Sequence, residues 1–282
     1  MKRLVVGSSG VLVAFGLVVG GCGSVGHTSP ADGSIDVPTS SGDASIDGVP
    51  PALGTQDSPA RTCGELALAG LPSAVYWLRD AAAASPAFQV YCEQQLNGGG
   101  WAMVENSVRR DDGSTTTFWQ FTYDARLKQF GTPAADQNYY DGSLYRLGTE
   151  YMDVFTDLPG TTRVAALMTA TGINPTTMRF IDPSWMGGNN DVFNDQFASG
   201  WSSQDHDDDA NASNCAVDYG NVAQHYGDCW VYNLGANANA PVLDGGVGPH
   251  VNDGVLTSLG LALQPSSGGY SQVARIARFT RW

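Results

Sequence analysis

The sequence predicts an irregular α+β domain with small antiparallel sheets, short helices and much loop. Gly, Asn, Asp and Ser are scattered densely through residues 61–282, which disfavours long regular elements. The apolar runs between these residues are short, as expected for small sheets and short helices.

The elements at the start of this domain follow in order. Residues 64–70 (GELALAG) predict a short helix. Apolar segments at 74–78, 88–92 and 101–104 predict three strands, the last entered through a turn at 97–100. Together the three strands predict a small antiparallel sheet.

The N-terminus indicates an exported protein. A basic head precedes an apolar stretch, 4–19, which is interrupted by Gly and Ser and is typical of a secretory signal rather than a membrane span. Val19-Gly20-Gly21-Cys22 resembles the bacterial lipobox, in which the cysteine becomes the acylated N-terminus. The alternative is a plain signal peptide with an incidental cysteine, which would leave an odd thiol in an oxidising compartment.

This organisation predicts three parts: a lipoprotein signal peptide at 1–21, lipidated Cys22 with a flexible tether at 22–60, and one domain at 61–282. The anchor predicts membrane attachment without a spanning helix. By analogy with lipoprotein sorting, Gly23 favours the outer membrane, on either its periplasmic or its cell-surface face. The tether does not resemble a coiled coil, and the existence of a homo-oligomer stays open.

The chain is acidic, with 28 Asp and Glu against 14 Lys and Arg and a net charge of -14. Nucleic-acid binding requires a basic surface, so this charge argues against a nucleic-acid partner. It suits an exported domain that binds cations.

Closely spaced carboxylates at 205–209 predict a structural calcium site. Calcium takes six to eight oxygen ligands, which Asp207 and Asp209 would supply together with backbone carbonyls of Asn211 and Ser213. An EF-hand is excluded, because its Gly and Glu positions hold Ala210 and Ala216 when counted from Asp205. A solvated acidic loop remains the alternative.

The spacing of several short motifs resembles the fibrinogen C-terminal domain, shared by fibrinogen, ficolins, tachylectins and bacterial exported proteins. The opening motifs are Cys63-Gly-Glu-Leu, Ser73-Ala-Val-Tyr76, Phe88-Gln-Val-Tyr-Cys-Glu93 and Gly98-Gly-Gly-Trp101. The later motif is Trp201-Ser-Ser-Gln-Asp-His-Asp-Asp-Asp209 followed by Asn214-Cys215-Ala216. The resemblance covers residues 61–282, is weak in the middle, and leaves 155–195 unaligned.

Several site assignments follow from this resemblance. Asp207 and Asp209 match the family's calcium aspartates, which lie eight and six positions before a cysteine, and Asn211 and Ser213 match its carbonyl ligands. The resemblance also implies two disulfides, Cys63–Cys92 and Cys215–Cys229. We refer to residues 215–229, closed by the second disulfide, as the clip.

The family's lectin members imply a small aromatic pocket for acetyl groups beside the calcium loop. That pocket would involve Tyr226, Asp228, Cys229 and Asn233, with a cis peptide bond between Asp228 and Cys229. The chain has Trp230 where the family often has His, which keeps a stacking surface but loses a hydrogen bond. The alternative for Tyr226 and Trp230 is ordinary packing in the core.

Catalytic motifs are absent from the sequence: there is no HExxH pair, G-x-S-x-G elbow, P-loop or Rossmann fingerprint. A metal-dependent hydrolase using His206 or His225 is a third option. We therefore expect a non-enzymatic, calcium-stabilised, lectin-like domain that binds carbohydrate or acetylated groups. The alternative is an adhesion or structural module that contacts proteins and has no sugar pocket.

Overall fold

A computed structural model describes residues 52–80, 86–112, 114–235, 248–264 and 268–282. All of them belong to one compact unit, Val49–Trp282. The predicted signal peptide at 1–21, Cys22 and residues 22–51 of the predicted tether lie outside the described residues. Within the described part of the chain, no helix is long and apolar enough to cross a membrane.

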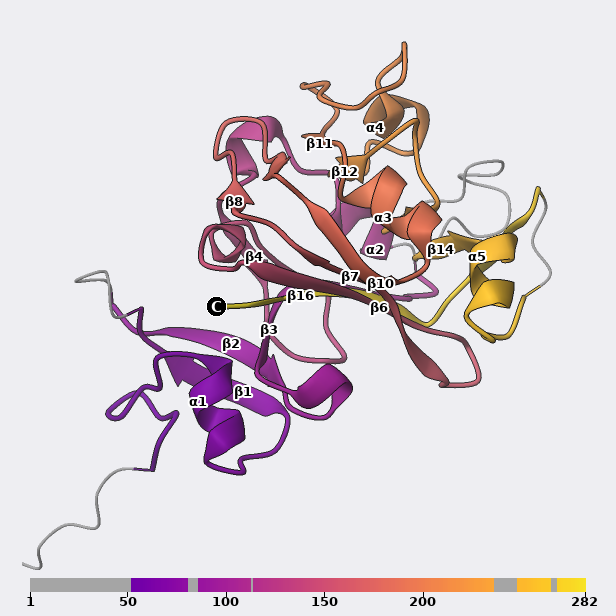
Figure 1. Cartoon of the computed structure of the whole chain (residues 1–282). Coiled ribbons are helices and arrows are strands. Elements are labelled where there is room, and N and C mark those ends of the chain that lie inside the picture. The colour runs from indigo at the N-terminus through magenta and orange to yellow at the C-terminus, as the bar shows by residue number, and fades with distance from the viewer. Residues whose placement is uncertain (1–51, 81–85, 113, 236–247, 265–267) are drawn as a thin grey trace, which may run out of the picture. The chain divides into compact units, whose positions relative to one another are not determined.

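One antiparallel sheet organises the domain (Figure 1). Its main path is β1-β2-β3-β16-β6-β7-β10, and β5 pairs with both β3 and β4. The strands are β1 (Ala74–Leu78), β2 (Phe88–Glu93), β3 (Trp101–Val108), β4 (Gln129–Gly131), β5 (Tyr139–Asp141), β6 (Glu150–Thr156), β7 (Thr162–Thr169), β10 (Ser184–Gly188) and β16 (Arg275–Arg281).

The last strand of the chain lies in the middle of this sheet. β16 pairs with β3 on one side and with β6 along its whole length on the other. Residues 276–280 are buried, so both faces of the strand are covered. The sheet is therefore completed only when the C-terminal segment lies between two strands from the first half of the described domain.

The predicted opening elements are confirmed. The helix α1 spans Cys63–Leu68, and the Thr62 hydroxyl caps it by accepting the Glu65 backbone N–H at 3.1 Å. The predicted strands correspond to β1, β2 and the first half of β3. The Cys63–Cys92 disulfide joins α1 to β2, as the resemblance implied.

The sequence composition predicted that the tether ends at residue 60 and the domain begins at residue 61. In the structure, residues 52–60 already belong to the fold. The Trp77 N–H donates to the carbonyl of Gly54 at 2.8 Å, and Ala60, which is 1% exposed, pairs with Leu78. A Cβ at Gly54 would come within 2.7 Å of the Tyr76 ring. Small residues allow this close packing, and their low hydrophobicity gives the segment the composition of a linker.

Short helices and two- or three-stranded sheets make up the rest, as the α+β class predicts. The remaining strands are β8 (Gly172–Ile173), β9 (Phe180–Ile181), β11 (Gly200–Ser202), β12 (Gln224–Tyr226), β13 (Tyr232–Asn233), β14 (His250–Asn252) and β15 (Tyr270–Gln272). The helices are α2 (Ser114–Phe118), α3 (Asn190–Gln196), α4 (Cys215–Asp218) and α5 (Asp253–Ser258), with 3₁₀ turns η1 (Leu96–Gly98), η2 (Tyr123–Ala125) and η3 (Leu144–Arg146).

A buried ionic network joins the later segments to the main sheet. Arg278 on β16 is fully buried and donates to both carboxylate oxygens of Asp153 at 2.7 and 2.9 Å. It also donates to the Tyr232 hydroxyl at 2.7 Å and lies 3.0 Å from Nδ1 of His225. The guanidinium thus holds β12, which lies within the clip, and β13, which follows it, against the sheet.

Candidate functional site

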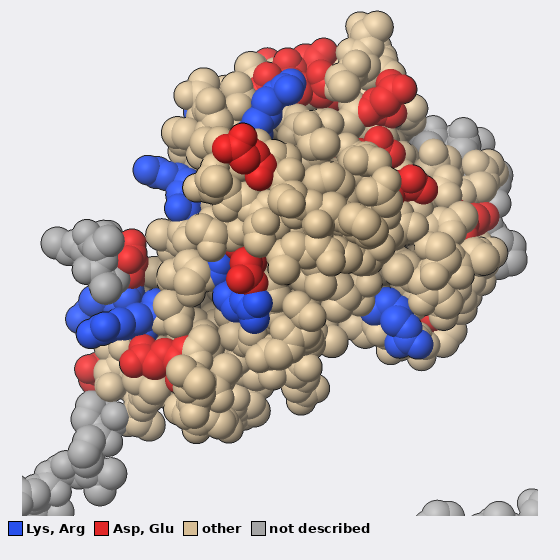
Figure 2. Space-filling view, viewed as in Figure 1, with Lys and Arg blue, Asp and Glu red and all other residues tan. Residues whose placement is uncertain are grey.

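The candidate site lies on the loop between β11 and α4, residues 203–214. Acidic side chains gather at this end of the face shown in Figure 2, in the region of β11, β12 and α4 in Figure 1. Asn214 fixes the base of the loop: its Oδ1 caps α4, and its Nδ2 donates to the carbonyl of Ser203 at 2.9 Å. One amide side chain therefore ties the loop's start to its end.

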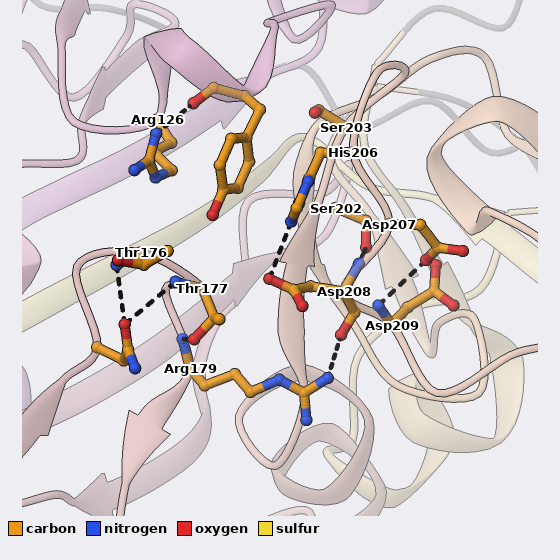
Figure 3. A network of polar contacts seen from close by, with 12 residues as sticks. Arg126, Thr176, Thr177, Arg179, Ser202, Ser203, His206, Asp207, Asp208 and Asp209 are labelled. Atoms are coloured by element: carbon orange, nitrogen blue, oxygen red, sulfur yellow. Dashed lines mark hydrogen bonds and ion pairs between the residues drawn. The ribbon is translucent and has the colours of Figure 1, made fainter.

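The carboxylates of Asp207 and Asp209 lie side by side, while the Asp208 side chain points away toward His206 (Figure 3). Asp209 accepts the N–H groups of Asn211 and Cys215, each at 2.9 Å. Burial raises the pKa of Asp209, and the negative charge of Asp207 raises it further. Two adjacent carboxylates that disfavour each other's charge would be stabilised by a cation between them.

Two of the predicted calcium ligands are backbone carbonyl oxygens. Within the described residues no hydrogen bond ends on the carbonyl oxygens of Asn211 or Ser213, so both are available as ligands. The described part of the chain holds no group of three or more His, Cys, Asp and Glu side chains suited to a metal. A cation here would therefore depend on carbonyl oxygens and water as well as the two carboxylates, as calcium sites commonly do.

The Cys215–Cys229 disulfide is present and closes the clip beside this loop. Asp228 is exposed, and its carboxylate accepts the side-chain amide of Asn211 at 2.7 Å. The clip and the acidic loop are thus joined by a covalent bond and a hydrogen bond.

The cis peptide expected before Cys229 is wrong: the Asp228–Cys229 bond is trans. Instead, Cys229 adopts a left-handed conformation with φ of 67°, and the Gly227 N–H donates to the carbonyl of Cys229 at 3.1 Å. The chain reverses through the left-handed residue, so the turn does not require a cis bond.

The aromatic residues of the predicted pocket are packed inside the domain. Tyr226 is fully buried, and its hydroxyl donates to the carbonyl of Val222 at 2.7 Å. Trp230 is 5% exposed and lies between the rings of Tyr270 and Tyr219, with centroid distances of 4.5 and 5.6 Å. Both side chains therefore pack in the core, which the sequence analysis gave as the alternative to a ligand pocket.

Asn233 is also fully buried and serves the protein's own hydrogen bonds. Its Oδ1 accepts the N–H of Gly235 at 2.9 Å, and its Nδ2 lies 3.3 Å from the Tyr226 hydroxyl. Of the predicted ligand-binding residues, Asp228 is therefore the one that is fully exposed, with Cys229 partly exposed.

The two histidines considered for hydrolysis lie in different environments. His225 is 1% exposed, with Nε2 2.9 Å from the Met178 carbonyl and Nδ1 facing Arg278. Burial and the Arg278 charge hold its pKa well below the usual value. His206 stacks on the Tyr123 ring at 3.6 Å and contacts Asp208. The structure does not bring these histidines together.

Sequence reasoning missed the contact between η2 and the acidic loop. The Tyr123 N–H donates to Asp205 at 2.9 Å, and the Tyr123 ring lies between His206 and the guanidinium of Arg126, which is 4.0 Å from the ring centroid. No local pattern in the sequence indicates this contact, because Tyr123 and Asp205 lie 82 residues apart.

Comparisons with known proteins agree with the fold. No family model matches the chain, and no curated protein matches it. Among solved structures it is similar to the fibrinogen-like globe domain of human ANGPTL6, with a TM-score of 0.54 and 24% identity. The match covers 79% of this chain and 96% of that domain. The described part of the chain therefore has the fibrinogen C-terminal-like fold.

Proposed function

We propose that the chain is a calcium-stabilised recognition domain on a lipid-anchored, exported lipoprotein. The observation that supports the calcium assignment is the pairing of the Asp207 and Asp209 carboxylates on a loop whose Asn211 and Ser213 carbonyl oxygens accept no hydrogen bond from the described residues. Calcium would neutralise the two carboxylates and hold the loop against the clip. The ion's role here is structural, because it shapes a binding surface and performs no chemistry.

Thermal unfolding of the full chain with calcium, magnesium or chelator tests this assignment. A ligand that binds only the native state at 100 times its Kd adds about 2.7 kcal/mol of stability. Asp207→Asn is the informative variant, because Asp207 accepts only a 3.3 Å hydrogen bond from the Asp209 N–H. This substitution should abolish the increase in melting temperature that calcium causes. In chelator, it should leave the melting temperature unchanged or slightly higher.

Asp57→Asn is the matched control, because it removes one exposed carboxylate outside the loop. It should retain the full calcium shift. An equal loss of stability in calcium and in chelator for Asp207→Asn would remove the ion-ligand role.

For the ligand, burial of Tyr226 and Trp230 favours the protein-binding alternative over an acetyl pocket at the clip. Exposed apolar side chains occur elsewhere: on the edge strand β10, Trp185 is 48% exposed and Met186 is 58% exposed. Exposed Trp side chains of this kind are frequent anchors in protein interfaces.

Carbohydrate or acetylated groups remain the second candidate. The observation that favours them is the exposed Asp228, which is hydrogen-bonded to Asn211 and so places polar groups at the clip's surface beside the acidic loop. Titration with N-acetylglucosamine in calcium separates the two candidates. The protein-binding function predicts no binding, whereas saturable binding that Asp228→Ala abolishes in a folded variant would support the sugar site.

A further inference from the structure

One cavity of the domain is lined by residues outside the acidic loop and the clip. It has a volume of about 530 Å³, within the range of small-molecule sites. Its walls come from β2, β4, β5, η3 and the segments beside them, and it shares no residue with the predicted calcium ligands or the clip.

The cavity combines an apolar wall with a buried acid. Phe88, Leu127, Leu144 and Leu147 provide the apolar surface. Asp141 on β5 also lines the cavity and is 5% exposed. An apolar surface together with a few positioned polar groups is typical of sites for small organic ligands.

The carboxylate of Asp141 is held in place by neighbouring groups, including the backbone of Leu144, and its two oxygens are not held equally tightly. Its Oδ1 accepts the N–H and hydroxyl of Ser143, at 3.0 and 2.6 Å. Its Oδ2 has the Tyr139 hydroxyl at 3.5 Å, the outer limit of a hydrogen bond. Burial also raises the pKa of Asp141, as expected for a carboxyl that has little contact with water.

The turn after Asp141 is closely packed, which fixes the backbone that carries this acid. A Cβ at Gly142 would lie 1.7 Å from the carbonyl oxygen of Arg126, which also accepts the Tyr140 hydroxyl at 2.6 Å. Only glycine fits there, so the backbone between Asp141 and Ser143 packs closely against Arg126.

We propose that this cavity binds an organic cation, a protonated amine on an apolar body. The ammonium group would donate to Oδ2 of Asp141, and the body would lie against Phe88 and the leucines. Asp80 at the wall and the protein's net charge of -14 both favour a cation over an anion. Arg146, also in the lining, is exposed and opposes the cation's charge.

Equilibrium titrations of the full chain by ligand-observed NMR test the proposal with three probes of similar size: 2-phenylethylammonium, 2-phenylethanol and phenylacetate. The ammonium should bind most tightly and phenylacetate most weakly. Asp141→Asn should raise the Kd of the ammonium about tenfold or more, the usual effect of losing a hydrogen bond to a charged group, and should leave the alcohol nearly unchanged.

An exposed variant keeps the test decisive where Asp141→Asn does not fold. Arg146→Gln removes the opposing charge and should lower the Kd of the ammonium about two- to threefold. Arg163→Gln on β7 is the control: Arg163 is exposed, lies outside the cavity lining and causes the same change in net charge. It should leave the Kd unchanged.

Three outcomes overturn the proposal. One is phenylacetate binding as tightly as the ammonium. Another is a folded Asp141→Asn protein that retains the affinity for the ammonium. The third is Arg146→Gln and Arg163→Gln having equal effects, because binding would then depend only on overall charge. None of these results depends on calcium or on the clip, so failure here is distinguishable from failure of the proposed function.

Discussion

At the residue scale, the fully buried Arg278 lies at the centre of an ionic network in the core. Its guanidinium compensates the buried carboxylate of Asp153 and lies 3.7 Å from that of Glu105. Burial raises the pKa of Glu105, and Arg278 opposes this rise. The stability of this site depends on the complete network, because an unpaired buried charge is strongly unfavourable.

Arg278→Met should therefore lower the free energy of unfolding by about 3–5 kcal/mol, the typical cost of breaking a buried ion pair. Urea denaturation followed by fluorescence measures it. Arg163→Met on β7 is the control, because Arg163 is exposed, and it should change the free energy by less than about 0.5 kcal/mol. Similar effects of the two substitutions would mean that the buried network does not stabilise the native state.

Because of His225, we expect the free energy of unfolding to fall in mild acid. Its native pKa is lowered well below the usual value near 6.5, so below pH 6.5 the unfolded state binds a proton that the native state does not. Stability is complete above the unfolded pKa and falls as pH decreases, by up to about 1.4 kcal/mol per pH unit from this group.

His225→Gln isolates this effect, because a glutamine amide can both donate to the Met178 carbonyl and accept from Arg278. The free energy of unfolding, measured by urea at pH 7.5 and 5.5, should differ less in the variant than in the wild type. The raised pKa of Glu105 acts in the opposite direction and is common to both proteins. An unchanged pH dependence would exclude His225 as the titrating group.

At the element scale, α4 and the acidic loop depend on Asn214. This side chain caps α4 and also holds the carbonyl of Ser203. Asn214→Ala should lower stability by about 1 kcal/mol through the lost cap and should also weaken calcium binding, because the ligand loop loses its fixed base. Calcium titration and thermal unfolding measure the two effects.

Asn252→Ala is the matched control for this prediction, since Asn252 caps α5 in the same way. It should cost similar stability and leave calcium affinity unchanged. Equal calcium affinities in the two variants would show that Asn214 acts only as a helix cap.

At the scale of the whole molecule, the lipid anchor is proposed from sequence alone, since Cys22 lies outside the described residues. Cys22→Ser should release the full chain from the membrane fraction, because acylation requires the thiol. Fractionation followed by immunoblotting measures the released share, and Ser24→Ala, two residues away, should stay in the membrane fraction. Unchanged retention of Cys22→Ser would remove the lipoprotein assignment.

The opening elements could be predicted from the sequence alone, and both disulfides followed from the family resemblance. The helix and strands over 63–104 follow from local patterns of apolar residues and turns, which act within a few residues. The cysteine and aspartate spacings were sufficient for the fold resemblance, because disulfides and calcium ligands require fixed residue types at fixed separations.

Only the tertiary structure decided the rest, because the contacts involved join residues far apart in the chain. It placed β16 between β3 and β6, around a buried Arg278 that a sequence pattern would assign to the surface. It buried Trp230 against Tyr270 and brought Asp141 into one cavity with Phe88. Packing of this kind depends on the shape and charge of side chains that are far apart in the sequence. The spacing of neighbouring residues therefore cannot predict it.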